Sequence, residues 1–231
     1  RNGLTTTYVY DKLGQLIREN DPHANKTTVY NYDRGGNILS CVEYAYTTGT
    51  LGAATQTTAY TYGDSNWKDK VTAIGGKTIT YDAIGNPLTY DGWTFTWKAG
   101  RMLASMVKSG TNAQFTYDHN GLRIKKVVNG VTTNYTLNGK NVVHMTQGSH
   151  DLHFFYDAQS RPAKARFNGT IYTYVHNLQG DIVGILDSAG NLVVEYKYDA
   201  WGKPTLVRTL TTAYEALAEL NPFRYRGYVF D

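Results

Sequence analysis

Alternating apolar and polar positions mark most of this chain as half-exposed β-strands. Trp93, Phe95 and Trp97 fall on one face of an extended segment, with threonines between them on the other face. Residues 192–198 alternate in the same way. A period of two residues is typical of a strand with one packed face and one solvated face. The pattern predicts an all-β fold.

A tyrosine–aspartate pair followed by a turn glycine recurs between these strands. From residue 81, the clear copies and their weaker echoes begin at 81, 97, 117, 135, 156, 176 and 198, in steps of 16 to 22 residues. A period near 20 indicates a repeat architecture, in which each unit packs on its neighbours. The predicted turn residues are Tyr10, Asp11, Gly14, Tyr32, Asp33, Gly36, Tyr81, Asp82, Gly85, Tyr117, Asp118, Gly121, Tyr156, Asp157, Tyr198, Asp199 and Gly202, with Ser160 standing where a glycine is expected after Asp157.

Turn chemistry explains this spacing. Aspartate at the start of a type I turn accepts a hydrogen bond from the backbone two residues on, and glycine three residues later tolerates a positive φ. Tyrosine is a good strand residue with a polar tip. The aspartates also resemble acid/base groups or calcium ligands, but a turn-forming role accounts for them without either. We therefore predict β-hairpin turns at each copy.

A second set of turns, built on glycine and asparagine, falls between the copies at 75–76, 129–130, 138–139, 168–169 and 190–191. Two turns per repeat predict an up-and-down run of hairpins in one long antiparallel sheet, curved or spiral. Two stretches break the rhythm. Small polar residues predict a long loop near 47–58, and residues 211–220 have a helical composition that Asn221-Pro222 ends.

Composition and charge argue against a nucleic-acid-binding surface and against a membrane span. Charged residues make up 18% of the chain and the net charge is +4, with lysine and arginine scattered along it. The densest basic runs, 123–126 and 224–226, are too short for a nucleic-acid patch and predict solvated strand faces. The sequence has no membrane-spanning run, and its single cysteine, Cys41, is expected to be a small core residue or a half-buried one. The chain opens in mid-pattern, which suggests a piece of a longer protein.

The remaining candidates for chemistry are few. His144, His150 and His153 lie close in sequence, but positions 150 and 153 of a strand point to opposite faces, so no shared metal site is expected. Asp181 and Asp187 bracket a strand and could be imagined as a glycosidase pair, although turn aspartates recur throughout. Aromatic side chains that could stack on sugar rings, with inter-strand packing favoured, are Trp67, Trp93 and Trp201. The sequence thus predicts no catalytic, cofactor-binding or metal-binding residues, and no enzyme.

The tyrosine–aspartate copies resemble the YD repeats of bacterial Rhs proteins. The stretch from Gly180 through residues 196–204 to the run Asn221-Pro222-Phe223-Arg224-Tyr225-Arg226-Gly227 is similar to the Rhs repeat-associated core, which the resemblance places at 172–231 within a single repeat domain over 1–231. The same family includes the C subunits of insecticidal Tc toxins and the animal teneurins. The resemblance implies a spiral β-sheet wound into a hollow shell.

In the bacterial toxins of this family, the shell encloses a C-terminal toxin domain that a protease-like segment after the core releases. The resemblance therefore implies a structural scaffold, secreted or on the bacterial cell surface, whose partner is a toxin or effector domain of the same polypeptide. The alternative is a carbohydrate- or receptor-binding module of a large surface protein, with cell-surface glycans as partners. No nucleic-acid partner, membrane span or cofactor is expected.

Overall fold

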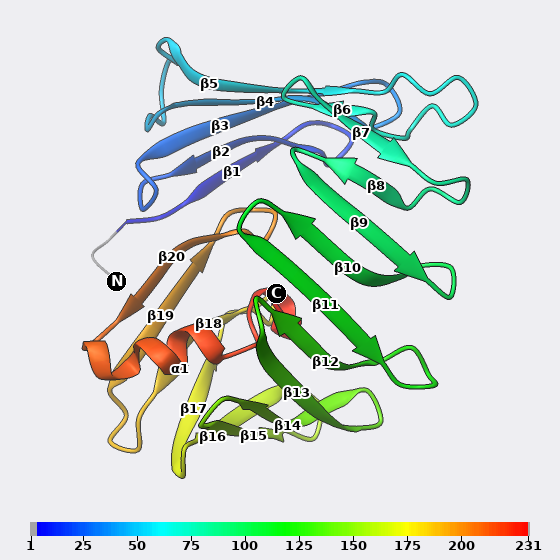
Figure 1. Ribbon diagram of the computed structural model, residues 1–231. Helices are drawn as coiled ribbons and strands as arrows, with labels where there is room; N and C mark the ends of the chain where they lie inside the picture. The colour runs from blue at the N-terminus through cyan, green and yellow to red at the C-terminus, as the bar shows by residue number, and fades with distance from the viewer. Residues whose placement is uncertain (1–3, 231) are drawn as a thin grey trace. The chain divides into compact units, whose positions relative to one another are not determined.

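The structure, a computed structural model, describes residues 4–230, and these form an all-β chain with short helices near the C-terminal end (Figure 1). By its internal contacts the chain divides between Ser109 and Gly110 into two compact units, and the single repeat domain over 1–231 stays a prediction. Such a division is natural in a repeat chain, where each element contacts mainly its neighbours in sequence. Each unit is described by itself. No helix within the described residues is long and apolar enough to span a membrane.

The first unit is an antiparallel meander in which each strand pairs with the next along the chain, from β1 to β10. Its strands are β1 (Thr7–Tyr10), β2 (Leu16–Asp21), β3 (Lys26–Tyr32), β4 (Ile38–Ala45), β5 (Ala54–Thr61), β6 (Ala73–Ile74), β7 (Lys77–Tyr81), β8 (Pro87–Tyr90), β9 (Trp93–Lys98) and β10 (Met102–Lys108).

The second unit repeats the meander from β11 to β20, again with antiparallel pairs of sequential strands. Its strands are β11 (Thr111–Tyr117), β12 (Arg123–Val128), β13 (Val131–Asn138), β14 (Asn141–Gln147), β15 (His150–Tyr156), β16 (Pro162–Phe167), β17 (Thr170–His176), β18 (Ile182–Leu186), β19 (Leu192–Tyr198) and β20 (Pro204–Thr209). The predicted all-β class with antiparallel hairpins is confirmed.

The main hydrophobic core lies in the second unit. Leu152, Ala165, Ile182 and Ile185 are completely buried, and they belong to one cluster with aromatic residues of β13 to β19. The C-terminal helical segment completes this core. It comprises a 3₁₀ turn (η1, Thr212–Tyr214), helix α1 (Glu215–Leu220) and a second 3₁₀ turn (η2, Tyr225–Gly227), and α1 lies next to β20 (Figure 1).

The predicted loop at 47–58 and the predicted helix at 211–220 both differ in extent from the elements in the structure. The loop expected at 47–58 ends earlier, because β5 begins at Ala54 and pairs with β4. Threonine is a good strand residue, and Thr55 donates its hydroxyl to the Glu43 carbonyl oxygen at 3.0 Å. Most of β5 is exposed on both faces, so its sequence lacks the apolar alternation that would have revealed a strand. The helix expected at 211–220 is a 3₁₀ turn followed by α1, which ends before Asn221-Pro222.

Candidate functional site: the repeat turns and the docked C-terminal segment

Each repeat turn is closed around an aspartate side chain. At Asp199, carboxylate oxygen Oδ1 accepts the backbone N–H groups of Trp201 at 3.0 Å and Lys203 at 2.9 Å. The Gly202 N–H donates to the Asp199 carbonyl oxygen at 3.0 Å, with a φ of 88° at the glycine. The aspartate thus satisfies the turn's own backbone donors.

The same pair of bonds to Oδ1 occurs at the other predicted turn aspartates, namely Asp11, Asp33, Asp82, Asp118 and Asp157. The Asn37 side-chain amide, followed by its backbone N–H, lowers the pKa of Asp33 below its usual range. Because these donors hold the Asp33 carboxylate ionised, it is a poor general acid. All of these aspartates accept backbone N–H groups of their own turns.

The sequence missed one copy of this turn, in which Asp187 accepts the N–H groups of Ala189 and Asn191. In the weaker echo that begins at residue 176, Asn177 takes the place of the aspartate. The 190–191 dipeptide therefore belongs to an aspartate turn and not to the second turn class. Conversely, the pair Tyr90-Asp91 makes a tight hairpin of the second class, with positive φ at Asp91 and at the glycine that follows. The spacing of aspartate and glycine, without tyrosine, would have found Asp187.

The tyrosine before several of the turns has a role that the sequence did not show. The Tyr198 hydroxyl donates to the Ile182 carbonyl oxygen at 2.7 Å, and the Tyr156 hydroxyl donates to the Val142 carbonyl oxygen at 2.6 Å. Ile182 is the first residue of β18 and Val142 is the second residue of β14, so each acceptor lies at the start of a strand that follows the turn of the preceding repeat. We call such a bond an inter-repeat rung.

Further rungs join Tyr32 to Leu16, Tyr62 to Ile38, and the Trp97 indole N–H to the Pro87 carbonyl oxygen. Tryptophan can replace tyrosine here because only a donor at the ring's far end is required. Burial raises the pKa of the Tyr156 hydroxyl to about 12. The rungs explain why an aromatic residue with a polar tip precedes the turn.

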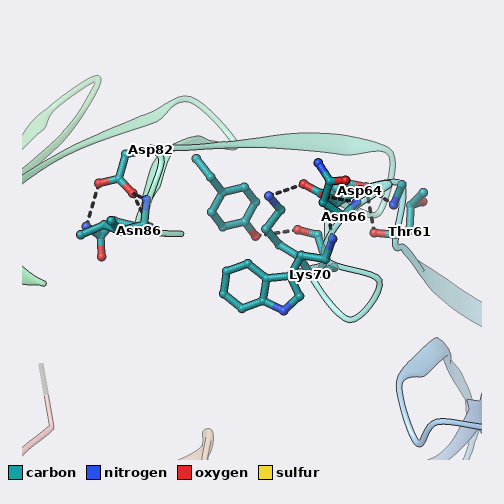
Figure 2. A network of polar contacts seen from close by, with 12 residues as sticks. Thr61, Asp64, Asn66, Lys70, Asp82 and Asn86 are labelled. Atoms are coloured by element: carbon teal, nitrogen blue, oxygen red, sulfur yellow. Dashed lines mark hydrogen bonds and ion pairs between the residues drawn. The ribbon is translucent and has the colours of Figure 1, made fainter.

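One variant repeat, around residues 62–72, is held by its own polar network (Figure 2). Asp64 Oδ1 accepts the N–H groups of Asn66 and Trp67, each at 2.9 Å, and its carboxylate pairs with Lys70. The Lys70 side chain, together with these backbone donors, lowers the pKa of Asp64 to about 2. Figure 2 also shows the separate pairing of Asp82 with Asn86. Asp64 is thus another turn carboxylate.

The C-terminal run that resembles the Rhs core is docked against the second unit. The Asn221 side chain is buried, accepts the Tyr174 hydroxyl at 2.7 Å and donates to the Phe223 carbonyl oxygen at 2.8 Å. The Phe223 ring packs edge-on against Phe154 at 4.9 Å. Buried polar groups that are fully paired fix a segment in one arrangement.

Arg224 corrects the prediction of a solvated basic run at 224–226. Its side chain is buried, lies 4.2 Å over the Tyr196 ring and donates to the carbonyl oxygens of Ala218 at 2.6 Å and Asn221 at 3.2 Å. It therefore satisfies carbonyl groups at the end of α1 that a helix leaves free. The local composition suggested exposure, whereas the burial arises from contacts with distant strands.

Asp181, once a glycosidase candidate, also binds this segment. Its Oδ1 accepts the Arg226 backbone N–H at 2.9 Å, and its Oδ2 accepts the Asn177 side-chain amide at 2.6 Å. Asp187 is engaged in its own turn. The two carboxylates thus serve different local structures.

The remaining candidates are placed as follows. Trp67 lies against Gly85, Trp93 stacks on Phe95 at 6.4 Å, and Trp201 is exposed in its turn. Cys41 is half-buried. Unexpectedly, His144 and His153 meet across the β14–β15 hairpin with Asp151 between them, whereas His150 stacks on Phe167. The sequence argument against a metal site considered positions 150 and 153 and overlooked the pairing of 144 with 153.

Sequential hairpins, aspartate turns and inter-repeat rungs define the chain as a YD-repeat protein. The family model for the teneurin YD-shell matches residues 1–207. The chain therefore belongs to the teneurin YD-shell family, which confirms the resemblance found in the sequence.

Curated relatives are similar over nearly the whole chain. The tRNA3(Ser)-specific nuclease WapA of Bacillus spizizenii is 33% identical over 230 residues, which are 96% of this chain and 9% of that protein. The tRNA nuclease WapA of Bacillus subtilis (strain 168) is 34% identical over 230 residues, with the same coverage of 96% and 9%. The chain thus spans about a tenth of the length of these relatives.

Solved structures show the same fold. The Tc holotoxin pore of Photorhabdus luminescens matches with a TM-score of 0.68 and 18% identity, covering 99% of this chain and 13% of that chain. The TcdB2–TccC3 crystal structure matches with the same TM-score of 0.68, 18% identity and the same coverage of 99% and 13%. Together with the family match, they support a scaffold role for the chain.

Proposed function

We propose that this chain is a non-catalytic segment of a YD shell that encloses a toxin or effector domain carried by the same exported polypeptide. The docked C-terminal segment carries the proposal. Hydrogen bonds made by Arg224, Asn221 and Asp181 hold residues 221–227 against the second unit. The last described residues of the chain therefore follow a segment whose position on the shell is fixed.

Two further observations support this proposal. The turn aspartates bind the backbone of their own turns, which gives these carboxylates a structural role. The matched relatives are named as tRNA nucleases, and this chain corresponds to 9% of their length. We assign the relatives' nuclease activity to regions outside the matched segment, and a shell role to the segment itself.

Protease protection in the complete polypeptide tests the shell role. We expect the domain that follows this chain to resist a protease that digests the same domain expressed alone. Arg224→Ala, which leaves the carbonyl groups of Ala218 and Asn221 without their donor, should make the downstream domain digestible. The control is Lys77→Ala, because Lys77 is 55% exposed and pairs with Asp91, which is itself 36% exposed, and an ion pair between exposed groups contributes little.

Equal digestion of the downstream domain in the complete polypeptide and alone would contradict the shell role. Catalytic silence is tested separately on the 231-residue chain, which should leave tRNA, peptide and glycan substrates intact. Steady cleavage that disappears on Asp118→Asn in a folded variant would overturn the non-catalytic assignment.

A further inference from the structure

A side-chain cluster on the β14–β15 hairpin is unrelated to the turns and to the C-terminal segment. His144 of β14 and His153 of β15 are direct cross-strand partners, and their rings stack with centroids 4.2 Å apart and an angle of 23°. Side chains directly opposite in an antiparallel pair lie within reach of one another. The hairpin register therefore joins two imidazoles that are nine positions apart in sequence.

Asp151 lies two residues before His153, so both side chains project from the same face of β15. Its Oδ2 is 2.7 Å from Nε2 of His144, and its Oδ1 is 3.1 Å from Nε2 of His153. Leu152, between them, is completely buried on the opposite face. The cluster thus lies on the face of the sheet away from the core that holds the C-terminal segment.

Donor type and spacing fit a divalent transition metal. One ligand atom from each of His144, Asp151 and His153 lies within 4.8 Å of the ligand atoms of the other two. Bonds of roughly 2.0–2.2 Å in a tetrahedron separate ligand atoms by about 3.4 Å, so a small opening of the Asp151 contacts admits an ion. Imidazole with carboxylate suits Zn²⁺, Cu²⁺ or Ni²⁺ better than Ca²⁺ or Mg²⁺.

We propose that His144, Asp151 and His153 form a surface metal site that takes a Zn²⁺-like ion with two imidazole ligands and one carboxylate ligand. All three side chains are partly exposed, so the ion keeps an open position for water and can enter from solvent. Once bound, it ties β14 to β15 and stabilises the hairpin according to its concentration and affinity.

A neighbouring positive charge, that of Arg166, should weaken metal binding at this site. Arg166 of β16 is the cross-strand partner of His153, and its charge acts on Asp151. Because like charges repel, removing this charge should tighten metal binding, a result that a simple Asp–His ion pair does not predict. Arg166→Gln is therefore an informative variant.

Titration calorimetry with Zn²⁺ alone tests the site, on the 231-residue chain prepared without a histidine tag. We expect one saturable site in the wild type. His144→Gln and His153→Gln should weaken it by more than about 100-fold, the upper end of the loss typical of a residue that only supports a ligand. His150→Gln is the matched control, since His150 lies in the same hairpin but contacts Phe167 and Asn168, and it should bind as the wild type does. Arg166→Gln should bind more tightly.

Circular dichroism of every variant checks that the fold is intact, and the isosteric Asp151→Asn exchange adds a variant of unchanged shape. Absorption of bound Co²⁺ in the wild type should show the bands of a low-coordinate site with nitrogen ligands. The proposal is overturned if the wild type has no saturable Zn²⁺ binding, if folded Asp151→Asn binds as tightly as the wild type, or if His150→Gln weakens binding as much as His144→Gln.

Discussion

The hydroxyl of Tyr198 donates a 2.7 Å hydrogen bond to the carbonyl oxygen of Ile182, sixteen residues earlier in the chain. Ile182 is the first residue of β18, the strand that follows the turn of the preceding repeat. Asp199, next to Tyr198, meanwhile closes its own turn. The tyrosine–aspartate pair thus combines two tasks, since the aspartate shapes one repeat and the tyrosine attaches it to the one before.

Removing a rung donor should destabilise the fold. Tyr156→Phe deletes the hydroxyl and leaves the carbonyl oxygen of Val142, a buried residue, without this donor. We expect the free energy of unfolding to fall by about 1–2 kcal/mol, the usual loss for a hydrogen bond whose partner stays buried. Chemical denaturation measures this change. Tyr10→Phe is the control, because Tyr10 has the same motif position but is 57% exposed; an equal loss in both variants would contradict the rung.

The stability of the fold at alkaline pH should depend on the same hydroxyl group, that of Tyr156. Burial raises the pKa of Tyr156 to about 12 in the folded chain, against about 10 when unfolded. A raised folded pKa means that its contribution to stability is complete below pH 10 and is lost as the pH rises through about 12. Thermal melts across this range should show a falling midpoint, with a smaller fall in Tyr156→Phe. Identical pH profiles for the two proteins would contradict the assignment.

The turn glycines should not be equivalent. Gly14 and Gly85 have positive φ of 78° and 86°, but a Cβ at Gly85 would lie 2.7 Å from the Trp67 ring, whereas nothing lies within 4 Å at Gly14. Both alanine variants carry the backbone strain of about 1–2 kcal/mol. Gly85→Ala must displace Trp67 as well, so it should lower the melting temperature further than Gly14→Ala. Equal melting temperatures would refute the packing of Trp67 on this turn.

The sequence predicted the elements that depend on local chemistry. Aspartate and glycine form the same turn at each predicted tyrosine–aspartate copy that has both, so Asp11 and Asp199 could be placed without a structure. The rungs could not, because Tyr198 reaches Ile182 only through the stagger between repeats. Arg224 was predicted to be solvated because it belongs to a short basic run, while its burial depends on Tyr196 and Ala218. The His144–His153 contact depends on the register of a hairpin whose turn the sequence analysis did not identify.

Ser160 offers a stabilising change. It occupies the glycine position of the Asp157 turn with a φ of 60°, a conformation that strains any residue with a Cβ. Ser160→Gly relieves this strain, partly offset by the greater freedom of glycine in the unfolded chain, and should raise stability by about 0.5–1 kcal/mol. Denaturant titration measures the gain. Ser188→Gly, in the Asp187 turn but outside the glycine position, should give none.

The docking of residues 221–227 is central to the account, and hydrogen exchange of the backbone amides tests it most directly. The Arg226 N–H donates to Asp181 at 2.9 Å, the Ile182 N–H donates to the Arg224 carbonyl oxygen at 3.0 Å, and the Arg224 N–H donates to the Tyr228 carbonyl oxygen at 3.1 Å. We predict that these amides exchange far more slowly than in an unstructured peptide, and that Asp181→Asn speeds exchange at Arg226. Exchange of the Arg224 and Arg226 amides at the unstructured rate in the wild-type chain would contradict the docked segment and the scaffold role built on it.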